Sequence, residues 1–172
     1  YGGGQAVVDA YCALGARQCV PVYNALDPQT HFPVEPRREL GADLALLANR
    51  LPDREQRIHE FFFNPATLLP TKRFLLGGSG WHENVPALKN LTCLGHVYTR
   101  DHNAFNSSPL AVLNVNRQSM AAFGFSPPTR IFEAAGAAAC IITDAWPGID
   151  HFLSPGEECL VAETGAQVAE LL

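Results

Sequence analysis

The segment Ser126–Gly136 combines residue types that can bind an anion. Ser126 can cap a helix, the two prolines that follow suit a first turn whose N–H groups are unpaired in any case, and Gly136 suits the end. We therefore predict a helix over 127–136. Because a helix N-terminus presents free N–H groups and about half a positive charge, it can hold a diphosphate. The residues predicted to contact this diphosphate are Ser126, Thr129 and Arg130.

Glu133 lies on the same predicted helix among the apolar residues of Ile131–Ala135. A carboxylate is costly to bury there unless hydrogen-bond donors surround it, and the hydroxyl groups of a ribose would supply them. A hydroxyl acceptor near a phosphate site indicates a nucleotide ligand. An ion pair between Glu133 and a nearby arginine is the structural alternative.

Polar side chains also follow the apolar run Leu44–Ala48. In an open parallel sheet the ligand lies outside the carboxyl ends of the strands, so residues at these ends are candidates for a site. Asn49 and Arg50 stand directly after the run, and Arg54 opens the next predicted helix. The two guanidinium groups can converge on a diphosphate, whereas two solvated surface arginines are the alternative.

Two further strand ends carry candidate residues. Gly77–Trp81 contains no G-x-G-x-x-G pattern opening a helix, so it is either a plain turn or a place where a base can approach the backbone. Asn114, Asn116 and Arg117 end the apolar run Ala111–Val115 and can bind sugar hydroxyls or phosphate. Capping of the next helix by Asn116 is the alternative, so we assign only one of the two asparagines to a ligand, namely Asn116, together with Arg117.

The elements that must position these residues alternate between short apolar runs and helical patterns. Such alternation predicts an α/β domain, a Rossmann-like parallel sheet flanked by helices. Ahead of this domain, the sequence predicts one more helix and one more strand, and then a turn-rich connection over Asn24–Arg38. The predicted strands are Cys19–Val22, Leu44–Ala48, Phe74–Leu76, Leu91–Leu94, Ala111–Val115, Cys140–Thr143 and Leu160–Ala162, and the predicted helices are Gln5–Leu14, about Asp53–Phe63, about Arg117–Phe123, 127–136 and Ala166–Leu172.

Composition narrows the functional classes. The net charge of −5 and the absence of any block of Lys and Arg argue against nucleic acid or an anionic membrane as the main partner. No apolar run approaches the roughly 20 residues that span a bilayer, and the N-terminus lacks a signal pattern, so we expect a cytoplasmic protein. The five cysteines show no ligand spacing, so we expect reduced, buried thiols and no metal site.

The motifs SPPTRIFEAAG at 126–136 and ITDAWPG at 142–148 resemble the C-terminal domain of bacterial spore-maturation-protein-like (CgeB-like) glycosyltransferases of GT-B architecture. The likeness extends back through Asn114–Arg117, Gly95–Val97 and Asn49–Arg54, and forward to Phe152–Glu158, so it covers most of the chain. It implies transfer of a sugar from a nucleotide-diphosphate donor, expected to be UDP-linked, to an unknown acceptor without a metal or other cofactor. It also places a domain boundary, with residues 1–38 as the trailing part of an N-terminal domain and linker, and residues 39–172 as the donor-binding domain.

The resemblance implies further site residues, and at one position the chain departs from the family pattern. In similar enzymes the backbone just past Gly95 reads the base edge, which makes His96 and Val97 pocket candidates, with a satisfied strand-end histidine as the alternative. Asp144 and Trp146 would close the same crevice, unless Asp144 only caps the turn before Gly148. Related families place a first glutamate eight residues before Glu133, where this chain has Phe125.

The catalytic residue is unknown from the sequence, because His31, Asp101 and His102 cannot be arranged into a catalytic set by spacing. The chain starts at Tyr1–Gly4 without methionine, so we expect a piece of a longer protein that binds a donor but does not transfer sugar alone. Two other functions stay open. One is a non-catalytic α/β binding or interaction module, which Phe125 favours, and the other is a nucleotide-sugar epimerase.

Overall fold

A computed structural model describes residues 3–172. Its centre is a six-stranded sheet in the order β3-β2-β1-β4-β5-β6, in which every neighbouring pair is parallel. The predicted Rossmann-like α/β architecture is therefore confirmed. The strands are β1 (Leu44–Leu47), β2 (Phe74–Gly77), β3 (Leu91–Gly95), β4 (Ala111–Asn114), β5 (Ile141–Asp144) and β6 (Leu160–Ala162).

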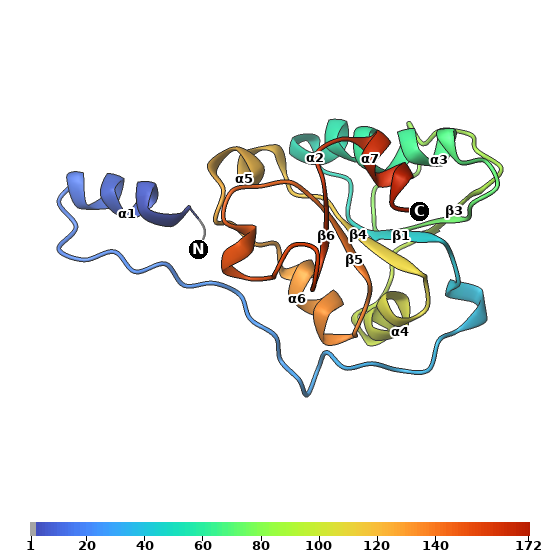
Figure 1. Ribbon diagram of the computed structural model, residues 1–172, viewed down its shortest axis with the longest axis horizontal. Coiled ribbons are helices and arrows are strands. Elements are labelled where there is room, and N and C mark those ends of the chain that lie inside the picture. The colour runs from blue at the N-terminus through green and yellow to red at the C-terminus, as the bar shows by residue number, and fades with distance from the viewer. Residues whose placement is uncertain (1–2) are drawn as a thin grey trace.

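Helices cover both faces of this sheet (Figure 1). One face carries α2 (Pro52–Ile58), the π-helical turn η2 (His59–Phe63), α3 (Asn64–Leu68), α5 (Gln118–Phe123) and α7 (Gly165–Glu170), and the other carries α4 (His102–Ser107) and α6 (Thr129–Gly136). Single 3₁₀ turns lie at η1 (Arg38–Leu40), η3 (Thr99–Asp101) and η4 (Ile149–His151). The structure thus stacks helix, sheet and helix, which hides the four central strands from water on both sides, whereas the edge strand β3 is mostly exposed.

The core follows the alternation of side chains along the strands. Leu44 and Leu46 of β1 pack with the phenylalanines of η2, whereas Ala45 and Leu47 face Phe105 of α4. All four residues of β1 are buried, as expected for a central strand covered on both faces.

The strand order places a switch point between β1 and β4. Because β1 connects to its neighbour β2 on one side and β4 connects to its neighbour β5 on the other, the two connections diverge and leave a crevice beyond the carboxyl ends of β1 and β4. Asn49 follows β1 and Asn114 ends β4, so polar side chains stand at the crevice.

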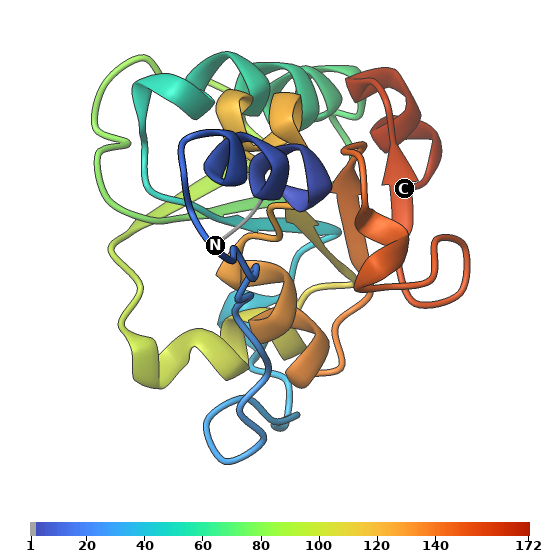
Figure 2. The same ribbon diagram turned by 90° about the vertical axis from the view of Figure 1, so that its left-hand side faces the viewer.

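The N-terminal part lies at one side of the domain. Helix α1 (Gly4–Ala13) stands apart from the sheet, and residues 14–37, here called the extended segment, run back along the domain without helix or strand (Figures 1 and 2). The predicted strand Cys19–Val22 is wrong. Val20 and Val22 are 63% and 72% exposed, because no sheet edge lies beside this stretch.

Three other local predictions are corrected. Helix α4 was not predicted, because its sequence His102–Ser107 is short and mostly polar. Helix α6 starts at Thr129 rather than 127, and its N-cap is Pro128 rather than Ser126. Of the five cysteines, all free thiols, only Cys159 is buried.

None of the helices within residues 3–172 has the length and apolar character needed to cross a bilayer.

Candidate functional site

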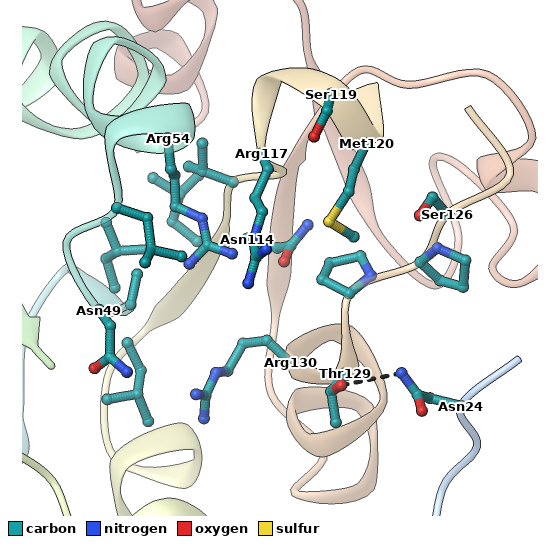
Figure 3. Close-up of a pocket in the computed structure, with 18 of the residues that line it drawn as sticks. Asn24, Asn49, Arg54, Asn114, Arg117, Ser119, Met120, Ser126, Thr129 and Arg130 are labelled. Atoms are coloured by element: carbon teal, nitrogen blue, oxygen red, sulfur yellow. Dashed lines mark hydrogen bonds between the residues drawn. The ribbon is translucent and has the colours of Figure 1, made fainter. Parts of the chain in front are cut away.

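A cavity of about 380 Å³ opens at the switch point, bordered by the ends of β1 and β4 and the N-terminus of α6 (Figure 3). The extended segment, the ends of β1 and β4, and the first turns of α2, α5 and α6 all contribute to its lining. The residues that line it are Tyr23, Asn24, Leu46–Asn49, Leu51, Arg54, Leu113–Val115, Arg117, Ser119, Met120 and Ser126–Arg130.

Three arginines give this cavity its charge. Arg54 comes from α2, Arg117 directly precedes α5, and Arg130 comes from α6. In Figure 3 the guanidinium groups of Arg54 and Arg117 extend towards the middle of the view, and the side chain of Arg130 extends to the left below them. Among the described residues that line the cavity there is no aspartate or glutamate. A protein of net charge −5 thus concentrates positive charge at the carboxyl ends of its central strands.

Arg54 is held in an unfavourable place. Its Nε is buried without a hydrogen-bond partner. Burial lowers the pKa of Arg54, and the neighbouring charges of Arg117 and Arg130 lower it further. A half-buried cation with an unpaired donor and like-charged neighbours binds an anion favourably, because the anion supplies both the missing acceptor and the opposite charge.

Asp53 ties two of the arginine-bearing elements together. Its carboxylate accepts hydrogen bonds from the backbone N–H of Ser119 at 3.3 Å and from the Ser119 hydroxyl. The first turn of α5 is thereby fixed to α2, which brings Arg54 and Arg117 to the same side of the cavity. This contact is a helix cap between segments 66 residues apart in the chain.

Glu133 already has protein partners. Its Oε2 accepts a hydrogen bond from Nη1 of Arg130, and Nδ1 of His102 lies 3.3 Å away. Burial by itself raises the pKa of Glu133, but the hydrogen bond with His102 and the charge of Arg130 outweigh it, so the pKa is lowered. Glu133 lies beside the cavity rather than in its lining, in the ion pair that the sequence left open as an alternative.

The start of α6 offers fewer amides than the sequence suggested. Pro127 precedes another proline, which disfavours helical geometry, and Pro128 is the extended N-cap residue with ψ 147°. Both prolines therefore precede the helix instead of forming its first turn. Neither proline has an N–H group to donate. Ser126 and Thr129 line the cavity without a side-chain cap on the helix, so ligand donors here are side chains more than backbone.

Asn49 and Arg50 have separate positions. Asn49 lines the cavity, and its Oδ1 accepts a hydrogen bond from the Ser79 N–H at 2.9 Å. Arg50 is not among the lining residues, because its Nε and Nη2 pair with the carboxylate of Glu55 at 3.1 and 2.8 Å. Of the two guanidinium groups predicted to converge here, the structure brings in only that of Arg54.

Asp144 is a buried residue at the end of β5 that connects the elements around the cavity. It is fully buried, forms an ion pair with Arg57, and accepts from the backbone N–H of Asn116 at 3.1 Å. Burial raises the pKa of Asp144, although the hydrogen bond and charge of Arg57 act against this. These contacts join the ends of β4 and β5 to α2, which is a structural task. Trp146 is also buried and packs against Phe152, outside the cavity.

Both asparagines at the end of β4 are buried, and only Asn114 lines the cavity. Nδ2 of Asn114 donates to the Thr143 hydroxyl at 3.0 Å, whereas Nδ2 of Asn116 lacks a partner. The sequence assigned Asn116 to a ligand, but Asn116 does not line the cavity, so the geometry favours Asn114 instead.

His96 and Val97 line a second hollow of about 220 Å³, beside the end of β3. The rings of His96 and Tyr98 meet edge to face at 4.7 Å, and Nδ1 of His96 lies 3.3 Å from the Ser79 hydroxyl. The structure therefore places these two residues near Asn49 through Ser79, but in a separate depression from the three arginines.

Tyr23, Asn24, Ser119 and Met120 line the cavity although the sequence did not single them out. Ser119 and Met120 lie one and two residues into a helix that follows a predicted strand end, so inspection of the first turn after Arg117 would have found them. Tyr23 and Asn24 come from the extended segment. No local sequence pattern predicts that this segment lies beside the cavity.

No cluster of three or more His, Cys, Asp or Glu side chains suited to a metal ion exists in the part of the chain that the structure describes.

The fold and cavity define a class: an α/β domain with a nucleotide-sized, positively charged crevice, matching one half of a GT-B protein. The profile of the family described as "Glycosyl transferase-like" matches residues 54–172, and the chain belongs to this family. No curated protein matches the sequence.

Solved glycosyltransferase structures share the fold. One is AviGT4, a glycosyltransferase involved in avilamycin A biosynthesis, with a TM-score of 0.64 and 16% identity over 98% of this chain and 51% of that one. Another is Anabaena Alr3699/HepE in complex with UDP and glucose, with a TM-score of 0.68 and 14% identity over 99% of this chain and 51% of that one. The GtfA/B complex is similar over 92% of this chain and 32% of its own, with a TM-score of 0.55 and 16% identity. The chain spans about half the length of the first two.

Proposed function

We propose that this chain is the donor-binding half of a glycosyltransferase, which holds a nucleotide-diphosphate sugar while the sugar passes to an acceptor. The observation that carries the proposal is the convergence of Arg54, Arg117 and Arg130 on a cavity at the switch point, with no acid in its described lining. Membership of the glycosyltransferase-like family supports it. So does the presence of UDP and glucose in the structure of Alr3699/HepE.

The chemistry asked of the site is stabilisation of a leaving group. When the bond between the sugar and the diphosphate breaks, negative charge grows on the β-phosphate. Fixed cations in a partly desolvated cavity stabilise that charge without reorganising, which is the usual large contribution to such transfers. Three guanidinium groups can do this without a metal ion, so the proposal includes metal independence.

The finer parts of the proposal concern lineage and donor. We propose the C-terminal domain of a CgeB-like protein, with residues 39–172 as the donor domain, a UDP-linked sugar as donor, and an acceptor bound mostly by the other domain. Asn114, Ser126 and Thr129 would contact the donor in addition to the arginines, because all three line the same cavity. Glu133 would reach the ribose only if its pairing with Arg130 rearranges.

A non-catalytic nucleotide-binding module is the second candidate, and Phe125 favours it. The left-handed Phe125 (φ 44°) stands where related enzymes carry a glutamate, and its ring fills the space beside Gly4 and Gly148. No carboxylate is available at that place to contact a sugar. A module of this kind would bind the nucleotide and leave the sugar intact.

The test is calorimetric titration of the chain with UDP, GDP and inorganic pyrophosphate. Wild type should bind the diphosphates, and Arg117→Met should weaken binding about 10-fold or more, the loss expected for one charge-assisted contact. Arg38→Met is the matched control, because Arg38 is exposed in η1 away from the cavity. Equal affinity in all three proteins would refute the placement. Transfer assays on the full-length protein then separate the enzyme from the module and, by product analysis, from an epimerase.

A further inference from the structure

The extended segment forms part of the wall of the cavity. Tyr23 and Asn24 both line it, although they lie more than a hundred residues before α6. Nδ2 of Asn24 donates a hydrogen bond of 3.1 Å to the hydroxyl oxygen of Thr129, the first residue of α6 (Figure 3). The ring of Tyr23 packs edge to face on Phe152 at 4.8 Å. The segment is thus attached at the place where the arginines meet.

The same segment follows α6 to its other end. A Cβ atom on Gly136 would lie 2.3 Å from Cδ1 of Leu26 and 2.6 Å from Cβ of His31, so only glycine allows this approach. On the neighbouring helix α4, Asn103 donates to the backbone carbonyl of Thr30 at 2.9 Å. The path of the segment across the domain is therefore specified by contacts at both ends of α6.

The hydroxyl of Thr129 is the connecting group. A hydroxyl can accept one hydrogen bond while it donates its own proton to another group. Because Asn24 donates to this oxygen, the proton is free to point elsewhere, and Thr129 lines the cavity of the three arginines. An anion that accepts from Thr129 would polarise the hydroxyl and strengthen its bond with Asn24.

We propose that a diphosphate bound among the arginines fixes the extended segment on the domain through Thr129 and Asn24. Asn24 is then a positioning residue for the donor, and the donor in turn sets the path of the chain that leads away from the domain. The inference rests on the proposed function, because it needs a diphosphate in this cavity. By thermodynamic linkage, donor binding and the Asn24 contact strengthen each other by the same factor. Loss of the contact must therefore weaken donor binding by the factor by which the donor stabilises the contact.

Hydrogen exchange of residues 18–32, measured with and without UDP and with inorganic pyrophosphate, tests the proposal together with calorimetric affinity. In wild type both ligands should slow exchange in this segment. Asn24→Ala and Thr129→Val should abolish that slowing and weaken binding about 2- to 12-fold, the equivalent of one neutral hydrogen bond. Gln18→Ala, an exposed change in the same segment, should behave as wild type.

The outcomes distinguish this inference from the proposed function. Binding of UDP with unchanged exchange in the segment overturns the coupling and leaves the donor site standing. Slowing by UDP but not by pyrophosphate overturns the phosphate contact at Thr129. Absence of binding by any diphosphate overturns both. Asn24→Ala binding as tightly as Gln18→Ala removes the positioning role.

Discussion

Replacing Arg54 with methionine should weaken diphosphate binding and, at the same time, stabilise the free protein. Methionine keeps an unbranched apolar stem of similar reach, so the packing of α2 is disturbed little, while the charge and the donors are removed. The two expected effects have opposite signs because Arg54 is placed for a ligand and not for a partner within the chain.

The loss of affinity follows from one charge-assisted contact. Hydrogen bonds to charged groups contribute about 1.5–3 kcal/mol, which corresponds to roughly a 10- to 150-fold rise in Kd. The upper part of this range is expected, since burial lowers the screening around Arg54. Titration with UDP at low and moderate salt measures it, and the salt dependence of Kd should fall in the variant.

The expected gain in stability on replacing Arg54 follows from the environment of this residue in the protein without ligand. Burial and the charges of Arg117 and Arg130 lower the pKa of Arg54, which means that the folded state disfavours its cationic form. Removing a partly buried donor without an acceptor returns about 1 kcal/mol, or about 2–4 °C in Tm for a chain of this size. Thermal unfolding of wild type and variant, both free of nucleotide, gives the number.

The refuting result is a variant that is less stable than wild type with unchanged affinity for UDP. That combination would show that Arg54 has a structural partner in solution and that the cavity does not use it. Arg38→Met is again the control, with no expected change in either quantity. A stabilised variant with unchanged affinity would retain the electrostatic argument and remove Arg54 from the ligand site.

Three other substitutions test the surroundings of the site. Arg57→Met should cost about 3–5 kcal/mol in urea unfolding, because it leaves the buried Asp144 unpaired. Arg57 lowers the pKa of Asp144 against the effect of burial, so its removal should raise this pKa further, and the loss of stability should be greater at pH 7 than at pH 4. A loss independent of pH would contradict the pairing. Glu133→Gln should lower the stability at pH 7, and the difference in unfolding free energy from wild type should vanish as the pH falls below about 4. The reason is that a carboxyl group with a lowered pKa contributes stability that is lost on protonation. A constant difference from pH 7 to pH 3 would contradict the ion pair of Glu133. Gly78→Ala should lower stability by ~2 kcal/mol or more in thermal unfolding, since φ of Gly78 is 129° and a Cβ atom there would lie 2.1 Å from the carbonyl oxygen of Ala48. An unchanged Tm would show that this turn can move.

The four central strands were predictable because they are short, apolar and buried on both faces. Leu44–Ala48 and Cys140–Thr143 each gave a strand within one residue of the observed bounds. The pattern failed where burial did not follow hydrophobicity, as at Cys19–Val22, whose apolar side chains lie on a segment without a neighbouring strand.

The site was predicted in part, since proximity along the chain identifies candidates but does not say how each side chain is satisfied. Arg54 was found because it opens a helix after a strand, and Arg130 because it lies in the first turn of a helix predicted to bind an anion. Arg50 differs from Arg54 only in finding Glu55 within reach, a contact that depends on the exact path of the loop. The long-range contact between Asn24 and Thr129 depends on the tertiary path of the extended segment, which no local pattern encodes.

The π-helical turn η2 lies within one continuous helical run, from α2 to α3, between the cavity-facing start of this run and the part that packs in the core. Arg54 lies in its first turns, and Phe61–Phe63 are all buried further along, which ordinary helical spacing of about 100° per residue cannot achieve on one face. The widened turn holds Phe61–Phe63 between the sheet and α7, where Gly165 approaches so closely that a Cβ would lie 2.0 Å from the carbonyl oxygen of Glu60. A π-helical turn takes one residue more than an α-helical turn, so deleting a single residue from η2 would leave a regular α-helical run whose two ends keep their relative phase. Arg54 would then stay at the cavity, and the core would lose one of the buried positions 61–63, so a change of length at this point alters the packing under the sheet and not the ligand end.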